Sequence, residues 1–249
     1  MKVKLEYGDG QVEVNLPDEN VDVFETGVTV KDPKALDDVK KATLDAILNP
    51  IGVKPISEQV HKGSKVVIVF PDRVKGGFQD DSHRKTSIPL IIEECEKNGV
   101  EEKDILLICS NGLHRKNKPE EIRKILGDEI FDRFYPLGQI INHDSEDWDN
   151  LVDLGYEPKF GAKVVINKFV YESDICFLIG HVQGNPYGGY SGGYKHCATG
   201  ITNWECISSH HCPEVMHRKD FVPVTSHSLM RQKFDAIGDW MEKCMNKKY

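Results

Sequence analysis

Three short runs of apolar, largely β-branched residues constrain the fold of this chain more than any other feature. They are KVVIVF at residues 65–70, DILLIC at 104–109 and DICFLIG at 174–180. Such runs are typical of strands buried on both faces, as in a parallel sheet covered by helices. Residues 86–98 and 118–126, which lie between the runs, are expected to be helical. The repeated order of strand, polar loop and helix predicts an α/β fold in which helices flank a mostly parallel sheet.

The two ends of the chain carry further signals. Residues 2–7 and 11–16 alternate between polar and apolar side chains around Gly8-Asp9-Gly10, which predicts an N-terminal β-hairpin. Helices are expected over residues 32–49, with Pro33 in the first turn, and over residues 226–245. Short strands are also expected at 21–30, 140–143, 151–154 and 163–169.

Length, charge and composition exclude several classes of protein. The 249 residues are enough for one large domain or two small ones. A net charge of −8 argues against a general nucleic-acid or anionic-membrane surface. No apolar run approaches the ~20 residues of a membrane helix, and the N-terminus lacks the apolar region of a signal peptide. Seven cysteines without CxxC spacing predict reduced thiols in a cytoplasmic protein. The oligomeric state is not indicated.

Polar residues concentrate in three loops, one after each apolar run, at 71–82, 110–115 and 181–193. In open α/β sheets, ligands bind beyond the carboxyl ends of the strands, where such loops gather. We therefore expect a ligand site at that edge of the sheet, built from all three loops.

The third loop leads into a glycine-rich stretch. Residues 188–195 read GGYSGGYK, with four glycines in six residues and Lys195 at the end. Glycine lets backbone N–H groups approach a ligand closely, and a following helix would add its positive end, so the stretch predicts an anion cradle. It is neither a P-loop nor a Rossmann fingerprint, because Gly-Lys-[Ser/Thr] and GxGxxG are both absent. A tight turn with a surface lysine is the simpler alternative.

Three features supply reactive or binding groups, each with a plainer alternative. Lys195, near the expected helix start, can act as an amine of lowered pKa that attacks a carbonyl-type carbon, or be a solvated charge. His114 follows the second strand and is a candidate base near neutral pH, or a structural residue. Asp72-Arg73 follows the first strand and can hold an anion, a carboxylate or a sugar hydroxyl, or form a surface ion pair.

The adjacent pair His210 and His211 lies fifteen and sixteen residues after Lys195. On a helix, neighbouring side chains project about 100° apart, so the pattern disfavours one ion held by both rings. One ring can be a metal ligand and the other its support. Zinc bound with Cys206 or Cys212 is an alternative, although no CxxC or HxxxH spacing is present.

Taken together, these segments resemble the lactate racemase family. The family motif Gly-[Tyr/Phe]-Ser-Gly-Gly-x-Lys matches residues 189–195, and Thr199-Gly200 stands where the family has a Pro-Gly-like pair. His211 has the family's spacing of sixteen residues after the lysine. Asp72-Arg73 and the segment NGLHR at 111–115 complete a resemblance that covers nearly all of the chain.

The resemblance implies a nickel-pincer nucleotide, a pyridinium mononucleotide whose two sulfur arms and one carbon hold nickel. Lys195 would carry this cofactor through a thioamide bond, and His211 would be the fourth nickel ligand. Square-planar coordination by soft donors suits nickel(II). The residues implied to hold the nucleotide are Asp72, Gly189, Ser191, Gly192 and Gly193.

The resemblance also implies a reaction. Arg73 would bind the substrate carboxylate, and His114 would take the hydroxyl proton while a hydride moves from the α-carbon to the cofactor. The planar 2-keto acid that results would receive the hydride on its other face, which inverts the centre. The implied protein is a cytoplasmic 2-hydroxyacid racemase or epimerase, and its partners are a small 2-hydroxy acid and the proteins that make the cofactor.

Three departures from the family pattern bear on this expectation. Asn185 stands where the family has a second acid/base histidine, so His181 or His196 is a candidate for that role. The loop after Arg73 is long, and its residues 83–85, His-Arg-Lys, can contact a larger or more anionic acid. Family members carry a further C-terminal domain that closes over the site, so residues 1–249 are expected to be the N-terminal catalytic and cofactor-binding domain. The remaining alternatives are a nucleotide- or phosphate-binding module without chemistry and a zinc enzyme using His210 and His211.

Overall fold

The computed structural model describes residues 1–24, 28–74, 78, 80, 82–185, 187–218 and 228–248. It contains two compact units, residues 1–38 and 39–249. In the first unit, β1 (Lys2–Tyr7) and β2 (Gly10–Asn15) form an antiparallel pair, which confirms the expected hairpin. The described part of 21–30 contains no strand, and residues 25–27 of that expectation lie outside the described residues.

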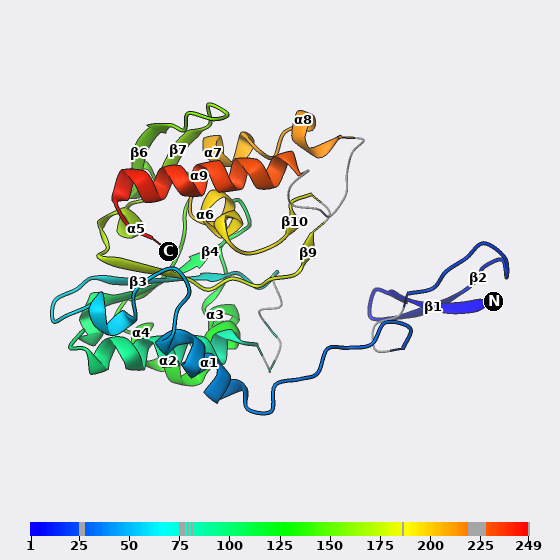
Figure 1. The fold of residues 1–249 in the computed structure, drawn as a ribbon, viewed down its shortest axis with the longest axis horizontal. Helices are drawn as coiled ribbons and strands as arrows, with labels where there is room; N and C mark the ends of the chain where they lie inside the picture. Colours follow the sequence, from blue (N-terminus) through cyan, green and yellow to red (C-terminus); the bar gives the residue numbers. More distant parts are fainter. Residues whose placement is uncertain are drawn as a thin grey trace. The chain divides into compact units, whose positions relative to one another are not determined.

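A four-stranded parallel sheet with the order β5-β4-β3-β8 lies at the centre of the second unit (Figure 1). Its strands are β3 (Val66–Pro71), β4 (Ile105–Ser110), β5 (Ile140–Asn142) and β8 (Ile175–Leu178). Every residue of β3 is buried. Its side chains alternate between two apolar cores, Ile68 and Phe70 on one face and Val67 and Val69 on the other. The parallel sheet, buried on both faces, is therefore confirmed.

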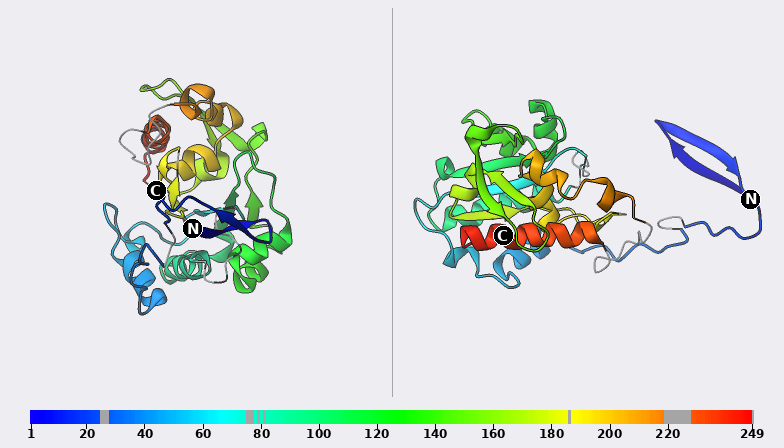
Figure 2. Two further views of the ribbon diagram at one scale, coloured as in Figure 1. Left: turned by 90° about the vertical axis from the view of Figure 1, so that its right-hand side faces the viewer. Right: turned by 90° about the horizontal axis from the view of Figure 1, so that it is seen from above.

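Helices cover both faces of the sheet, as Figures 1 and 2 show. One face carries α1 (Val39–Leu48), α2 (Arg84–Lys97), α3 (Pro119–Leu126) and α4 (Asp128–Phe134). The other carries α6 (Tyr194–Gly200), α7 (Trp204–Ser208) and α9 (Leu229–Met245), together with the antiparallel pair β6 (Leu151–Tyr156) and β7 (Lys163–Asn167). The shorter elements are α5 (Lys168–Glu172), α8 (Pro213–Met216), β9 (Gly184–Asn185), β10 (Gly189–Tyr190) and 3₁₀ turns at Ile56–Glu58, Glu102–Asp104 and Trp148–Asn150.

Several expected boundaries are wrong. Helix α1 begins at Val39 rather than near Pro33, because residues 31–38 are exposed and a short helix without packing is marginal. Strand β7 stops at Asn167, whose side chain accepts hydrogen bonds from the N–H groups of Phe169 and Val170 and so starts α5. Helix α9 begins after Ser228, its N-cap, while residues 226–227 lie outside the described residues. In the described ranges, no helix is long and apolar enough to span a membrane.

The loop after β4 packs backbone to backbone against α6. Gly112 has a φ of +53°, and its N–H donates to the carbonyl of Gly200 at 3.2 Å. A Cβ on Gly112 would lie 2.1 Å from the carbonyl oxygen of Thr199, and a Cβ on Gly200 would lie 2.7 Å from Cβ of Ser110. Only glycine fits either position, so the lysine-bearing helix is seated directly on the end of the central sheet.

Replacing Gly112 with alanine should therefore cost more than about 3 kcal/mol of unfolding free energy, because backbone atoms must move apart. Gly138→Ala is the matched control: Gly138 has a φ of +72°, but no atom lies within 4 Å of its added Cβ. That variant should lose only about 1–2 kcal/mol, from backbone strain alone. Urea unfolding measures both losses, and equal losses would contradict the close packing.

Candidate functional site

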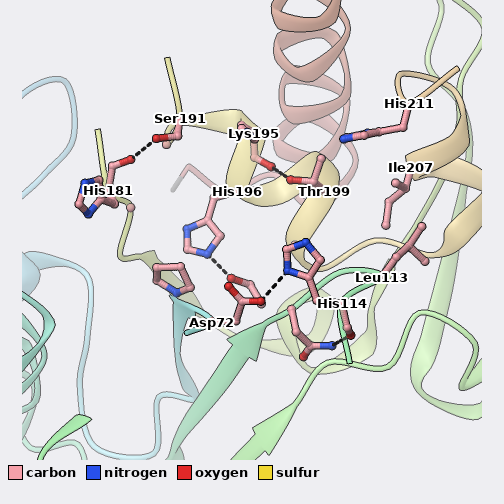
Figure 3. Close-up of a pocket in the computed structure, with 16 residues that line it drawn as sticks. Asp72, Leu113, His114, His181, Ser191, Lys195, His196, Thr199, Ile207 and His211 are labelled. Atoms are coloured by element: carbon pink, nitrogen blue, oxygen red, sulfur yellow. Dashed lines mark hydrogen bonds and ion pairs between the residues drawn. The ribbon is translucent and has the colours of Figure 1, made fainter. Parts of the chain in front are cut away.

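A cavity of about 390 Å³ opens at the carboxyl ends of β3, β4 and β8 (Figure 3). The first loop contributes Asp72, the second Asn111 and His114, and the third His181. Helix α6 and the segments on either side of it add Ser191, Gly192, Lys195, His196, Thr199 and His211. The three loops that follow the apolar runs thus meet at one cavity.

Asp72 and His114 form a hydrogen-bonded pair on the cavity wall. Asp72 is 2 % exposed, and its Oδ2 lies 2.6 Å from Nδ1 of His114. Its Oδ1 accepts a hydrogen bond from the N–H of Val74 at 3.1 Å. An ionised carboxylate only accepts hydrogen bonds, so Nδ1 of the imidazole carries the proton and Nε2 keeps a lone pair. His114 is therefore held in the tautomer that can take a proton from a ligand.

Asn111 lines the same cavity and has one unsatisfied acceptor atom. Its amide nitrogen donates to the carbonyl of His114 at 3.2 Å, which steadies the loop. Its Oδ1 is buried and has no hydrogen-bond partner among the described residues. Because an unpaired buried acceptor is costly, this oxygen suits a ligand that brings a hydroxyl or N–H donor.

Lys195 enters the cavity from the first turn of α6, directly after the glycine loop. The loop needs its glycines, because Gly192 and Gly193 have φ of +85° and +56°. Both Lys195 and His211 line the cavity, and the charge of Lys195 is the second cause, after burial, that lowers the pKa of His211. The two residues named by the sixteen-residue spacing therefore face a common space.

His210 sets the tautomer of His211. Nε2 of His210 lies 3.0 Å from the carbonyl oxygen of Ala198, so this nitrogen carries a proton. Burial lowers the pKa of His210 to about 3, so the ring is neutral and its Nδ1 is an acceptor. Nδ1 of His211 lies 2.7 Å from that atom and must be the donor. Nε2 of His211 is then left with a lone pair, as a metal ligand requires.

Other residues expected at the site lie beside the cavity rather than on its wall. Arg73 lies 3.6 Å from Glu121, between Nε and Oε1, while its buried Nη1 has no hydrogen-bond partner in the described residues. Gly189 and Gly193 belong to the glycine loop but do not line the cavity. Asn185 Oδ1 accepts hydrogen bonds from the N–H groups of Tyr187 and Gly188, at 3.0 and 2.8 Å, and so closes the β9–β10 turn.

The basic segment 83–85 also lies outside the cavity wall. His83 precedes α2, and its ring lies 6.0 Å from that of His181, centroid to centroid. Arg84 is fully buried and donates to Oγ of Ser82 at 3.0 Å. The segment therefore supports the wall that carries His181.

Ser110 and His196 form a second polar pair, which the sequence did not suggest. Oγ of Ser110 donates to the carbonyl of Phe70 at 3.0 Å, so it accepts from Nε2 of His196. Nδ1 of His196 is buried without a hydrogen-bond partner among the described residues. Burial and, second, the charge of Arg84 lower the pKa of His196 to about 4. His196 is therefore neutral at physiological pH. The sequence offered this histidine as an acid/base candidate, but it did not suggest the pairing with Ser110.

This neutral state predicts a pH dependence of stability. Between pH 6.5 and about 4, the unfolded chain binds a proton at His196 that the folded chain does not, so the unfolding free energy falls as the pH falls. The contribution is fully present above pH 7, and its slope approaches ~1.4 kcal/mol per pH unit. Urea unfolding of the wild type and His196→Gln from pH 4.5 to 8 should give a shallower curve for the variant. Parallel curves would show that the pKa of His196 is the same in the folded and unfolded chains, which would contradict its burial as a neutral ring.

Among the residues that the structure describes, no three His, Cys, Asp or Glu side chains are grouped to hold a metal ion. Cys206 is fully buried, and burial raises the pKa of its thiol to about 12. A zinc site formed by His210, His211 and cysteine side chains therefore has no support in this part of the chain. A metal whose other ligands come from a cofactor needs only one protein ligand, and His211 can supply it.

The fold and the cavity together define an α/β domain of the open-sheet class, with a lysine, an Asp–His pair and a metal-competent histidine at the strand ends. The chain belongs to the lactate racemase N-terminal domain family, whose model matches residues 7–222. The resemblance inferred from the sequence is confirmed.

Two curated relatives are lactate racemases. The protein from Thermoanaerobacterium thermosaccharolyticum is 25% identical over 214 residues, which are 85% of this chain and 47% of the relative. The one from Lactiplantibacillus plantarum is 26% identical over 169 residues, or 68% of this chain and 37% of the relative. The chain thus spans about half the length, or less, of the curated relatives it matches.

The solved structures agree on the fold. The lactate racemase apoprotein from T. thermosaccharolyticum superposes with a TM-score of 0.77 and 23% identity, over 99% of this chain and 54% of that one. A protein from Thermotoga maritima gives a TM-score of 0.62 and 19% identity, over 84% of this chain and 48% of that one.

Proposed function

We propose that residues 1–249 form the N-terminal, catalytic and cofactor-binding domain of a cytoplasmic 2-hydroxyacid racemase or epimerase. The observation that carries the proposal is the meeting of Lys195, His211 and the Asp72–His114 pair in one cavity. The family membership and the relatives named lactate racemase support the same class of reaction.

The cavity has groups that fit a nickel-pincer nucleotide. Lys195 would provide the amine for the covalent bond, and Nε2 of His211 the metal ligand. Asn111 Oδ1 is an acceptor suited to a sugar hydroxyl, while Ser191 and Gly192 offer a wall that the nucleotide can approach closely. Asp72, Gly189 and Gly193 would contribute by shaping the surrounding loops. When bound, the cofactor would supply a reversible acceptor for the hydrogen on the α-carbon of the substrate.

The chain itself would bind the acid and move its proton. His114 would accept the hydroxyl proton at Nε2, because Asp72 holds Nδ1 protonated and stabilises the imidazolium that forms. Arg73 lies beside the cavity, and it would bind the substrate carboxylate by turning its guanidinium, whose buried Nη1 has no hydrogen-bond partner in the described residues, toward the bound acid. A domain that closes over the cavity would exclude water during the reaction.

We assign the second proton-handling role to His181 rather than to Asn185 or His196. An amide cannot exchange a proton near neutral pH, and Asn185 is engaged in closing the β9–β10 turn. His196 is 8 % exposed, and its Nε2 is already engaged by Ser110. His181 lines the cavity on the side away from His211 (Figure 3). The two enantiomers of a 2-hydroxy acid direct their hydroxyls differently, and two separated imidazoles can serve both.

Intact-mass and metal analysis would test the proposal. The chain, within its full-length protein, would be purified from a host that also expresses the cofactor-synthesis proteins and then assayed on a panel of 2-hydroxy acids. A mass increase located on Lys195 with stoichiometric nickel, and interconversion of enantiomers, is expected. An unmodified chain that still binds nucleotides would favour a binding module, and stoichiometric zinc without an adduct would favour a zinc enzyme.

A further inference from the structure

One helix contacts both segments that carry the proposed anchors. Arg231, on α9, is 1 % exposed, and its guanidinium donates to three carbonyl groups of the glycine loop. Nε reaches Gly188 and Nη1 reaches Gly192, both at 3.2 Å, and Nη2 reaches Tyr190. The guanidinium also lies over the ring of Tyr190, 3.8 Å from its centroid. A residue about 40 positions away thus organises the loop.

The three accepting carbonyl groups belong to every second residue of the loop, and their common direction toward Arg231 fixes the direction of three N–H groups. The carbonyl and N–H of one peptide unit point in opposite directions. The N–H groups of Gly189, Ser191 and Gly193 are therefore directed away from Arg231, and that of Ser191 donates to Gln183 at 2.8 Å. The planar fork of arginine matches several acceptors at once, which a single ammonium does not.

Further along α9, a glycine makes room for the helix that carries Lys195. A Cβ on Gly238 would lie 2.2 Å from the ring of Tyr194, the residue before the lysine. The same helix also reaches the histidine pair. The ring of Phe234 packs 4.8 Å from that of His210, and Nζ of Lys233 donates to the carbonyl of Ser209 at 2.6 Å.

We infer that α9 is the positioning element of the site: Arg231 clamps the glycine loop, and Gly238 seats Tyr194, so that Lys195 is held in place relative to His211. The catalytic role of this positioning rests on the proposed function. The positioning of Lys195 can be tested independently of that function, because it can be measured in the protein without cofactor. Arg231 and Gly238 are positioning residues, since neither lines the cavity.

Hydrogen–deuterium exchange of the cofactor-free protein tests the clamp. In Arg231→Gln and Arg231→Lys, amides of residues 187–200 should exchange about tenfold faster or more, while those of β3 and β4 keep wild-type rates. Asp235→Asn is the matched control, because Asp235 lies 3.8 Å from Arg231 on the exposed side of α9 and touches no loop carbonyl. Uniformly faster exchange, unchanged exchange, or full protection in the lysine variant would each overturn the clamp.

A double-mutant cycle keeps the test informative if the Arg231 variants do not fold. Gly238→Ala should loosen residues 194–200, and adding Tyr194→Ala should remove most of that effect because the clash disappears. Additive effects would overturn the seating of Tyr194.

The fraction of chains carrying an adduct on Lys195 provides the functional readout. It should fall at least severalfold in Arg231→Gln and stay at the wild-type level in Asp235→Asn. If wild-type protein carries no adduct at all, the proposed function fails, while the exchange data still decide the positioning role.

Discussion

Lys195→Ala should abolish covalent attachment of the cofactor and, with it, all racemase activity. Lys195 is the lysine that lines the cavity in the described residues, and it lies in the first turn of a helix fixed between the central sheet and α9. A thioamide bond needs a primary amine at that point, and α6 is held by close contacts of Gly112 with the carbonyl of Thr199 and of Gly238 with the ring of Tyr194. Intact mass spectrometry of protein co-expressed with the cofactor-synthesis proteins measures the loss directly.

Lys195→Arg separates the tether from the charge. Arginine keeps the positive charge that lowers the pKa of His211, but its guanidinium does not form the thioamide. Both variants should therefore lose the adduct while retaining a wild-type unfolding transition. Lys168→Ala, on α5 away from the cavity wall, should load normally. An adduct that persists in either Lys195 variant would move the attachment to another residue.

His114→Ala should lower turnover by about 10²–10⁴-fold, the usual contribution of a positioned acid/base. The cofactor should stay attached, because the proposed tether is the amine of Lys195, while the imidazole of His114 is paired with Asp72. Steady-state racemisation of the preferred 2-hydroxy acid, with the adduct checked by mass, measures the effect.

Asp72→Asn is the informative companion to the His114 variant. An amide can accept the Nδ1 proton or donate its own, so the imidazole is no longer held in one tautomer. The turnover should fall in the same direction, with the imidazole itself still present. His217→Ala alters an exposed histidine outside the cavity and should leave turnover unchanged. Full activity in His114→Ala would place the base elsewhere, with His181 the next residue to replace.

The parallel sheet could be predicted from sequence because its signal is local. Runs such as KVVIVF are stable only when both faces are buried, and residues of β3 do alternate between two apolar cores. The glycine-lysine motif and the spacing from Lys195 to His211 could be identified for a similar reason, because both are patterns in the order of residues along the chain. Polar loops after successive strands then indicated one edge of the sheet, and the cavity lies there.

The pairings within the site depend on contacts between distant residues, and only the folded chain brings them together. Asp72 meets His114 across 42 positions, Ser110 meets His196 across 86, and Arg231 reaches the glycine loop across about 40. Asn185 differs, because its side chain accepts hydrogen bonds from residues two and three positions further along the chain and so closes a local turn. Local preference along the chain selects strands and loops, but tautomers, orphaned acceptors and the orientation of a lysine follow from which side chains the packing places within hydrogen-bonding distance.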